Sequence, residues 1–299
     1  MESIQVNVLI STYNGQKYIC EQINSIWNQT YKNIKIYIRD DGSVDETIKT
    51  VKRFDTENKI EIIKGKNVGF GRSFLELLKI SETGDLWAFC DQDDLWLPKK
   101  IEWAVKWFQS ADKEKPALFH SAFEMRSAQL DRCEGYYLPP HYEVDFRRCL
   151  TDCVCQGFSI VINRSLREKM LMCDIAKSWS HDWMAMLIAV SFGTMEFDER
   201  IGVWHRRTPV SISSMKLRNR MKWFWHMFIY ESATKNTLCE FEQVFGKQLS
   251  REKRELLCCF THDRYSLKDS IKKAFFPKRW RPLLSSEMAV RFLMLLGKI

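Results

Sequence analysis

The chain of 299 residues lacks the segments that would carry it into or across a membrane. Its first residues, MESIQVNVLIST, contain no basic leader, no long apolar core and no cleavage site of small residues. No stretch approaches the ~20 consecutive apolar residues that cross a bilayer as a helix. From these absences we expect a protein that is made and kept in the cytosol.

Two glycine-rich phosphate-binding motifs are also missing. No Gly-x-Gly-x-x-Gly follows the first predicted strand, and the chain contains no Gly-Lys-Ser/Thr loop. These absences argue against a dinucleotide-dependent dehydrogenase and against a P-loop NTPase. If the protein handles phosphate groups, we expect a metal ion rather than a glycine loop to bind them.

The ten cysteines do not show the spacing of a zinc site. Cys153-x-Cys155 and the adjacent pair Cys258-Cys259 lack the two-pair pattern that structural zinc requires. Other cysteines lie in apolar or helical segments, where a free thiol is a common small core residue. We therefore expect reduced, structural thiols.

The net charge of +8 is unevenly distributed along the chain. Residues 210–299 contain 18 Lys and Arg against 8 Asp and Glu, whereas residues 1–209 carry a net charge of −2. A nearly neutral first part is thus followed by a strongly basic one, which indicates separate roles for the two parts.

Apolar patterns predict alternating strands and helices in the first hundred residues. Apolar or alternating runs predict strands over 5–11, 34–38, 59–63 and 86–90, and helical spacing predicts helices over 16–28, 45–57 and about 74–78, with a fourth from about Pro98. This order is typical of a mainly parallel sheet with helices on both faces. In such sheets, ligands bind outside the carboxyl ends of the strands.

Polar clusters follow three of these strands: Ser11–Asn14, Asp40–Ser43 and Asp91–Asp94. The last closes the run LWAFCDQDD, in which three carboxylates fall within four positions. Such closely spaced like charges repel, and a divalent cation is the usual remedy, although a solvated acidic turn is the simpler alternative. Because the three clusters converge on one edge of the sheet, the sequence favours a binding site.

Several segments resemble the family 2 glycosyltransferases of the GT-A fold, and most closely the bacterial rhamnosyltransferase type. They are VNVLISTYNGQKYICEQINSIWNQT, IRDDGSVDET, Asn67-Val68-Gly69 and FCDQDDLWLPKKIE. The resemblance covers roughly residues 5–210. It implies an α/β, Rossmann-like, mainly parallel sheet flanked by helices as a catalytic domain over 1–209. The nucleotide-sugar half would span about 1–98 and the acceptor half about 99–209, followed by a basic, aromatic, mainly helical region over 210–299.

The resemblance also assigns the donor site. Asp40 and Asp41 match the pair that reads the base and the ribose, and which of the two contacts the base is left open. Asp91 and Asp93 match the Asp-any-Asp motif, which binds Mg²⁺ or Mn²⁺ together with the diphosphate, while Asp94 is expected to cap the next turn or to share the metal. Seven residues are thereby expected to bind the donor nucleotide: Thr12, Tyr13, Asn14, Asp40, Asp41, Asn67 and Asp91.

Asp182 matches the family's catalytic base, which takes a proton from the acceptor hydroxyl. Here His181 precedes it where most members carry an acid, and this histidine either tunes Asp182 or only packs. Asp182 begins a helical pattern, so a helix cap is the alternative interpretation. One displacement assisted by one base inverts the anomeric centre, and no enzyme nucleophile is required.

The resemblance places further residues near the acceptor or the diphosphate, each with a structural alternative. Gln156 and Gly157 would form part of the acceptor pocket or of the core. Arg206 would touch the diphosphate or lie on a solvated surface, and Trp96 would border the sugar or belong to the core. The full set is Trp96, Gln156, Gly157, His181, Trp183 and Arg206.

The basic region combines cations with apolar aromatic segments at 221–230, 271–284 and 291–299. This mixture suits an anionic membrane surface, which would explain access to an acceptor on a polyprenyl diphosphate. A helical bundle packed on the catalytic domain with a soluble basic face is the alternative. Nucleic acid is a weaker candidate, because no nucleic-acid-binding module is recognisable, and none is expected as a partner.

The sequence thus predicts an inverting transferase that uses a nucleotide sugar, such as dTDP-rhamnose or a UDP-sugar. Its acceptor would be a glycan or lipid-linked glycan of bacterial surface polysaccharide (O-antigen or capsule), at the inner face of the cytoplasmic membrane. A sugar nucleotidyltransferase is the enzymatic alternative, although its basic glycine-rich loop is missing. A non-catalytic membrane-surface assembly protein on the same scaffold is the other.

Overall fold

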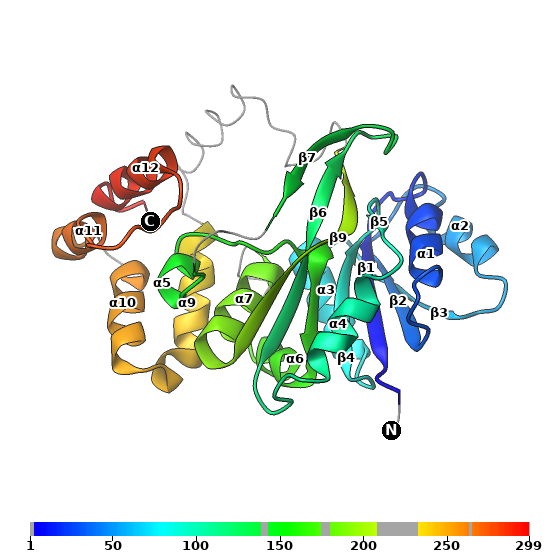
Figure 1. Cartoon of the computed structure of the whole chain (residues 1–299), viewed down its shortest axis with the longest axis horizontal. Coiled ribbons are helices and arrows are strands. Elements are labelled where there is room, and N and C mark those ends of the chain that lie inside the picture. The colour runs from blue at the N-terminus through cyan, green and yellow to red at the C-terminus, as the bar shows by residue number, and fades with distance from the viewer. Residues whose placement is uncertain (1–2, 139–142, 175–179, 208–232, 263–264, 299) are drawn as a thin grey trace.

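The structure is a computed structural model that describes residues 3–138, 143–174, 180–207, 233–262 and 265–298. Within these residues, a nine-stranded sheet runs through the molecule and is covered by helices on both faces (Figure 1). The strand order is β3-β2-β1-β4-β8-β6-β9-β5, and β7 pairs with β6 at the side.

The first hundred residues alternate strands and helices as predicted, with ends shifted by a few residues. The strands are β1 (Val6–Thr12), β2 (Ile34–Asp40), β3 (Ile60–Lys64) and β4 (Leu86–Asp91). The helices are α1 (Ile19–Trp27), α2 (Thr47–Phe54), α3 (Phe70–Ile80) and α4 (Lys100–Phe108), with the short strand β5 (Leu95–Trp96) before α4.

The second part of the chain adds a mixed group of strands and a set of helices. Its strands are β6 (Ala117–Arg126), β7 (Cys133–Tyr137), β8 (Ile160–Asn163) and β9 (Thr194–Arg206). Its helices are α5 (Phe146–Cys149), α6 (Arg164–Leu171), α7 (His181–Phe192), α9 (Ala233–Phe245), α10 (Arg251–Thr261), α11 (Leu267–Ala274) and α12 (Leu284–Leu295), with 3-10 turns at Gly157–Ser159 and Gly246–Gln248.

The parallel half of the sheet brings the predicted polar clusters to one edge. Strands β3, β2, β1 and β4 are parallel neighbours, whereas β8 is antiparallel to β4. In this register Thr12 is opposite Asp40, and Ser11 is opposite Asp91. The prediction that the ends of β1, β2 and β4 converge is therefore confirmed.

Alternate residues of the buried strands belong to two separate hydrophobic cores, one on each face of the sheet. Leu9 belongs to a core that also contains residues of α3 and α7, whereas Val8 and Ile10 belong to one that contains residues of α1 and α4. A strand buried on both faces needs a continuous apolar run instead of an alternating one, which is what Val8, Leu9 and Ile10 provide in β1.

The C-terminal helices continue the first of these cores. Phe241 and Phe245 of α9 pack on Phe192 of α7, and Trp280 packs on Phe260 of α10. The mainly helical character predicted for this region holds for its described residues, while the aromatic segment at 221–230 lies outside them. No helix among the described residues combines the length and apolarity needed to span a bilayer. All ten cysteines are free thiols.

Candidate active site

A single side chain joins the turn after β1 to the acidic turn after β4. Gln92 Oε1 accepts hydrogen bonds from Thr12 Oγ1 at 2.6 Å and from Tyr13 N at 3.0 Å, and Gln92 Nε2 donates to Tyr13 O at 3.1 Å. The contact also explains Gly15, because a Cβ there would lie 2.2 Å from Gln92 Oε1. The two turns therefore form one connected wall.

The turn after β1 is tied in the same way to the turn after β2. Asn14 N donates to Ser43 Oγ at 2.9 Å, and Asn14 Oδ1 accepts from Val44 N at 3.0 Å. Asn14 adopts a φ of 51°, a left-handed conformation that asparagine tolerates better than most residues. The side chain of Asn14 therefore helps to hold the turn after β2 in place.

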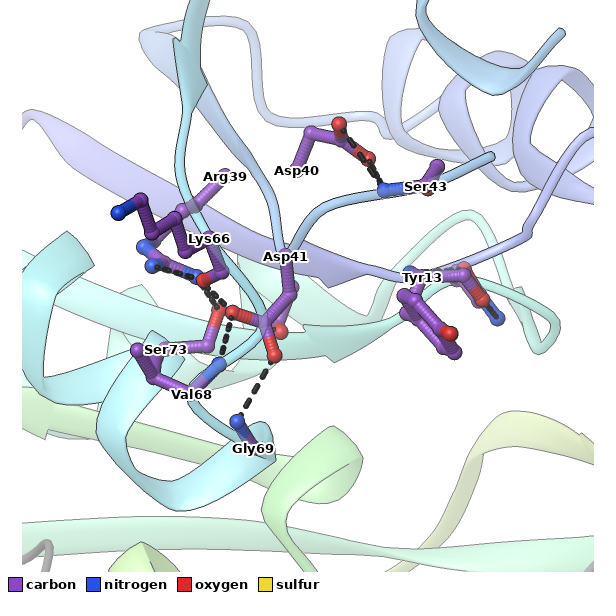
Figure 2. Close-up of polar contacts among 11 residues, drawn as sticks. Tyr13, Arg39, Asp40, Asp41, Ser43, Lys66, Val68, Gly69 and Ser73 are labelled. Carbon is purple, nitrogen blue, oxygen red and sulfur yellow. Dashed lines mark hydrogen bonds and ion pairs between the residues drawn. The ribbon is translucent and has the colours of Figure 1, made fainter. Parts of the chain in front are cut away.

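Asp41 is held by a network within the protein (Figure 2). Its Oδ1 accepts from Arg39 Nη1 and from Val68 N at 2.9 Å, and its Oδ2 accepts from Gly69 N at 2.9 Å. Arg39 and Asp41 are both almost fully buried, so their ion pair is shielded from water. Asp41 thereby fixes the loop that connects β3 to α3.

Asp40 keeps more of its hydrogen-bonding capacity. Among the described residues, its two carboxylate oxygens accept only from Ser43 N, each at the long distance of 3.3 Å (Figure 2). Asp40 lines an open groove of about 600 Å³ together with Gly42 and Ser43. Between the two carboxylates, Asp40 is thus the better placed to accept a hydrogen bond from a ligand.

Five of the predicted site residues line one pocket of about 280 Å³. They are Tyr13, Asp41, Asn67, Asp91 and Asp93. Gln92 and Phe70 complete the wall, and the rings of Tyr13 and Phe70 are about half exposed. The pocket therefore combines exposed aromatic faces with three carboxylates at the carboxyl ends of β1, β2 and β4.

The carboxylates of the acidic turn are destabilised in their charged form. Burial raises the pKa of Asp91 well above its usual range, and the charges of Asp94 and Asp93 raise it further. Burial and the charge of Asp94 likewise raise the pKa of Asp93, to about 6. Both groups would be stabilised by a nearby positive charge.

His205 places a positive charge behind the turn. Burial alone would lower the pKa of His205, but the charge of Asp94 and the 2.8 Å contact between Asp94 Oδ1 and His205 Nδ1 raise it to about 9. Asp94 Oδ1 also accepts from Arg206 N at 3.1 Å. The prediction that Asp94 caps the following turn is therefore wrong, because its side chain is bound to β9.

The residues of the acidic turn fit a divalent cation that is shared with a ligand. The described residues contain no cluster of three or more acidic, histidine or cysteine side chains arranged as a metal cage. Mg²⁺ and Mn²⁺, however, are commonly held by one or two carboxylates together with phosphate oxygens. The carboxylate oxygens of Asp91 accept no hydrogen bond from another described residue, and the repulsion described above would be relieved by a cation. Asp91 and Asp93 are the residues that would hold it.

Asp182 is the second residue of α7. Its Oδ2 accepts from Gly157 N at 3.2 Å, and its Oδ1 accepts from Trp183 N at 2.8 Å. An N-cap side chain reaches the second or third amide that follows, so these bonds are not those of a cap. The charge of Asp182 contributes to the raised pKa of Asp91, which shows that the two carboxylates are near each other.

His181 is an uncharged side chain in an aromatic enclosure. Its ring centroid lies 4.2 Å from that of Phe74 and 4.7 Å from that of Phe89, and burial lowers its pKa. Neither ring nitrogen has a hydrogen-bond partner among the described residues. A Cβ at Gly157 would lie 2.5 Å from His181 Nε2, so glycine is what allows the ring to pack under this loop.

The loop that carries Gln156 and Gly157 is anchored to the C-terminal helices. Arg281 Nη1 lies 2.5 Å from Asp152 Oδ1, and Arg281 Nη2 donates to Thr151 O. The oxygen Oε1 of Gln156 is buried without a hydrogen-bond partner among the described residues. The position of this loop, which supports Asp182, therefore depends on a residue between α11 and α12.

Three other predicted site residues lie in the interior. Trp96 is buried, with Lys100 Nζ 3.8 Å from its ring centroid, and Trp183 is buried with its Nε1 donating to Cys149 O at 2.7 Å. Arg206 donates to Asp93 O at 2.7 Å, to Ala128 O at 2.6 Å and to Glu21 Oε2 at 2.5 Å. Arg206 thus braces the acidic turn from behind.

Sequence reasoning did not single out Gln92, Arg39 or the partnership of His205 with Asp94. Gln92 stands between the carboxylates of the DQDD segment, so its place in the motif was the available signal. The contact of His205 with Asp94 joins residues 111 positions apart, and no local pattern could have indicated it.

Residues 7–171, more than half of the chain, match the family model described as glycosyl transferase family 2. The chain belongs to this family. The family assignment made from the motifs is thereby confirmed, as is the fold, which is that of the GT-A glycosyltransferases.

Two bacterial glycosyltransferases with named donors resemble parts of the chain. The dTDP-rhamnosyl transferase RfbG of Shigella flexneri is 37% identical over 102 residues, which are 32% of this chain and 35% of RfbG. The UDP-Glc:alpha-D-GlcNAc-diphosphoundecaprenol beta-1,3-glucosyltransferase WfgD of Escherichia coli is 23% identical over 62% of this chain and 71% of WfgD. The chain spans about a third of the length of RfbG and of uncharacterised glycosyltransferases from Nostoc sp. and Haemophilus influenzae.

Solved structures share the fold at low sequence identity. TarS of S. aureus (residues 1–349) in complex with UDP-GlcNAc superposes with a TM-score of 0.59 and 15% identity, over 98% of this chain and 89% of that structure. The mannosyltransferase PcManGT of Pyrobaculum calidifontis, in complex with GDP-Man and Mn²⁺, superposes with a TM-score of 0.55 over 100% of this chain and 86% of that structure.

Proposed function

We propose that this family 2 protein is an inverting glycosyltransferase that moves a sugar from a nucleotide sugar to a glycan or lipid-linked acceptor. The proposal rests chiefly on one observation: Asp91 and Asp93 share a pocket with Tyr13 and Asp41 at the carboxyl ends of the strands, and Asp182 is near enough for its charge to raise the pKa of Asp91. The pathway would be bacterial surface polysaccharide synthesis, such as O-antigen or capsule.

The donor would bind along the edge formed by β1, β2 and β4. Tyr13 offers an exposed ring against which a base can stack, and Asp40 offers free acceptor positions for a ring N–H or a ribose hydroxyl. Thr12, Asn14 and Asp41 hold the surrounding loops, and Asn67 lines the same pocket. Mg²⁺ or Mn²⁺ at Asp91 and Asp93 would supply charge neutralisation for the diphosphate.

The acceptor would approach from the side of Asp182. This carboxylate takes the proton of the acceptor hydroxyl while that oxygen bonds to the anomeric carbon. The bond between this carbon and the diphosphate oxygen breaks, and the leaving nucleoside diphosphate keeps the electron pair. One displacement from the face opposite to the leaving group gives inversion. Gly157 N holds Asp182 in place through its 3.2 Å hydrogen bond.

The similar proteins support a choice of donors and acceptors. RfbG is a dTDP-rhamnosyl transferase, WfgD uses UDP-Glc and a diphosphoundecaprenol-linked acceptor, and TarS was solved with UDP-GlcNAc. We therefore place dTDP-rhamnose and UDP-sugars first among the donors and a polyprenyl-diphosphate-linked glycan first among the acceptors. The enzyme would act at the inner face of the cytoplasmic membrane, with the anionic membrane surface as a partner of its C-terminal region.

A thermal-shift panel of nucleotide sugars with Mn²⁺ tests the proposal. A bound donor stabilises the folded state by RT ln(1 + [L]/Kd), so the correct donor should raise the melting temperature above all others. The Asp93→Ala variant should lose the metal-dependent part of this shift, while the exposed Asp112→Ala variant should keep it. A shift by the donor that is equal with and without Mn²⁺ would contradict the metal assignment.

A further inference from the structure

The segment that contains α11, α12 and their flanking residues carries more than half of the exposed large hydrophobic side chains of the described chain. Of its 18 exposed large hydrophobic residues, ten lie between Tyr265 and Leu296, and the other eight are scattered from Tyr13 to Met172. We call these ten the terminal apolar surface: Tyr265, Leu267, Ile271, Phe275, Leu283, Leu284, Met288, Phe292, Leu295 and Leu296.

These side chains follow helical spacing on the outer side of both helices. Leu267 and Ile271 on α11 are four residues apart, and Phe275 follows after four more; Leu284, Met288 and Phe292 repeat this spacing on α12. Residues four apart share one face of a helix. On α12 the other side contributes Val290, Leu293 and Met294 to the buried interior, so this helix is apolar on two sides and the core accounts for only one of them. On α11 the buried residues are Ser270, Lys273 and Ala274, so the larger apolar side chains of this helix are the exposed ones.

The exposed charged side chains of residues 265–298 are all cations, although Glu255 of the neighbouring helix α10 interacts with Lys272. Lys268, Lys272, Lys278 and Arg279 are exposed. The acidic residues between positions 265 and 298 are Asp269, which is partly buried, and Glu287, which is buried and paired with Arg291. This surface of α11 and α12 therefore presents apolar side chains and cations without an exposed carboxylate.

We propose that the terminal apolar surface docks on an anionic phospholipid bilayer, with α11 and α12 lying in the headgroup region and the four cations at the lipid phosphates. Amphipathic helices with basic rims bind such interfaces, and each Lys or Arg near an anionic surface adds to the attraction. This inference rests on the proposed function, because docking on a bilayer would bring the enzyme to a lipid-linked acceptor.

The position of the two helices suits this role. They form the end of the molecule opposite to α2 and β3 (Figure 1). Docking through α11 and α12 would leave the nucleotide side of the sheet in water, where a soluble donor can enter. The side that carries α7 and Asp182 lies between the two ends and would be nearer to the membrane (Figure 1).

A second copy of the chain is a poorer occupant of the same surface. A symmetric dimer contact would bring the same patch of both copies together. Lys268, Lys272, Lys278 and Arg279 of one copy would then face their equivalents, with no exposed carboxylate on this surface to pair with them. Anionic lipid headgroups provide the missing negative charge.

Cosedimentation of the full chain with phospholipid vesicles tests this proposal. We expect binding to phosphatidylcholine vesicles that contain phosphatidylglycerol, and weaker binding to phosphatidylcholine alone. A Phe275→Ser, Met288→Ser, Phe292→Ser variant should lower the partition coefficient at least about tenfold, because it removes three apolar anchors. A Lys268→Gln, Lys272→Gln, Lys278→Gln variant should remove the preference for anionic lipid. The matched control Ile80→Ser, Leu138→Ser, Met172→Ser removes exposed apolar groups elsewhere and should bind like the wild type.

Two results would overturn the proposal. One is unchanged vesicle binding by the Phe275→Ser, Met288→Ser, Phe292→Ser variant. The other is a wild-type chain that does not bind vesicles but forms a dimer, if the same three substitutions dissociate that dimer. Melting curves show that each variant is folded. Nucleotide-sugar binding, measured on the same samples, separates the two proposals. If the wild-type chain binds a donor but not vesicles, only the docking proposal is refuted. If it binds vesicles but no donor, the proposed function is refuted.

Discussion

Gln92 Oε1 lies 2.6 Å from Thr12 Oγ1, so one side chain sets the spacing between the acidic turn and the turn after β1. We expect Gln92→Leu, which removes three hydrogen bonds, to lower the free energy of unfolding by about 1–3 kcal/mol. It should also weaken donor binding, because Tyr13 is no longer held. The exposed Gln109→Leu variant is the control. Chemical denaturation and nucleotide titration measure both effects, and wild-type values in both would refute this role for Gln92.

The neighbouring carboxylates Asp40 and Asp41 should respond differently to the same substitution. Asp41→Asn removes a buried ion pair with Arg39 and leaves an amide near the donors Val68 N and Gly69 N, so we expect a loss of about 3 kcal/mol in stability. Asp40→Asn should leave the melting temperature nearly unchanged and weaken nucleotide binding. Calorimetric titration and melting curves on the pair test this division, and the reverse pattern would show that Asp41 is the ligand-binding residue.

Asp182→Asn should lower the rate of sugar transfer by roughly 10²–10⁴, because the amide cannot take a proton from the acceptor. Donor affinity should stay the same, and the amide oxygen can still accept from Gly157 N. A coupled assay of nucleoside diphosphate release, with donor binding measured in parallel, tests this expectation. Asp112→Asn, on the surface, serves as the control. Turnover at the wild-type rate would remove Asp182 from its proposed role.

Lys100 should make the stability of the protein depend on pH. It is fully buried, and burial lowers its pKa to about 7. In the unfolded chain the same group keeps its proton up to about pH 10.4. Between these two values the unfolded state binds more protons, so stability should rise as the pH increases from 7 towards 10.

Melting temperatures measured across this range test the prediction. Lys100→Met should remove the rise that Lys100 causes, whereas the exposed Lys99→Met should retain it. If Lys100→Met and the wild type change in parallel with pH, Lys100 is charged in the folded state.

The sequence predicted the elements that obey a simple local rule. The strand β4 is an unbroken apolar run that ends in charge, and the helix α1 has Ile19, Ile23 and Ile26 on one side, so both were found within a few residues of their ends. The edge where Ser11 meets Asp91 followed from the parallel order alone.

The features that the sequence did not predict depend on contacts between segments that are distant in the chain. Asp94 was expected to cap a turn because only its neighbours in sequence were visible, and its true partner, His205, arrives with the last strand of the sheet. Trp96 is buried in the core that also contains residues of α1 and α4, and Lys100 lies against its ring. Composition also indicated cations in the last ninety residues. The sequence did not show which apolar side chains of α11 and α12 are exposed, because this depends on which side of each helix packs against the rest of the protein.

The contact of Arg281 with Asp152 and Thr151 means that the last helices cannot be treated as a removable appendage. A chain shortened before α11 would leave Asp152 without its cation and expose the part of the core that surrounds Phe260. It would also free the loop whose amide supports the proposed base. Arg281 lies between α11 and α12, so the segment that we propose to contact lipid also holds the loop next to the proposed base.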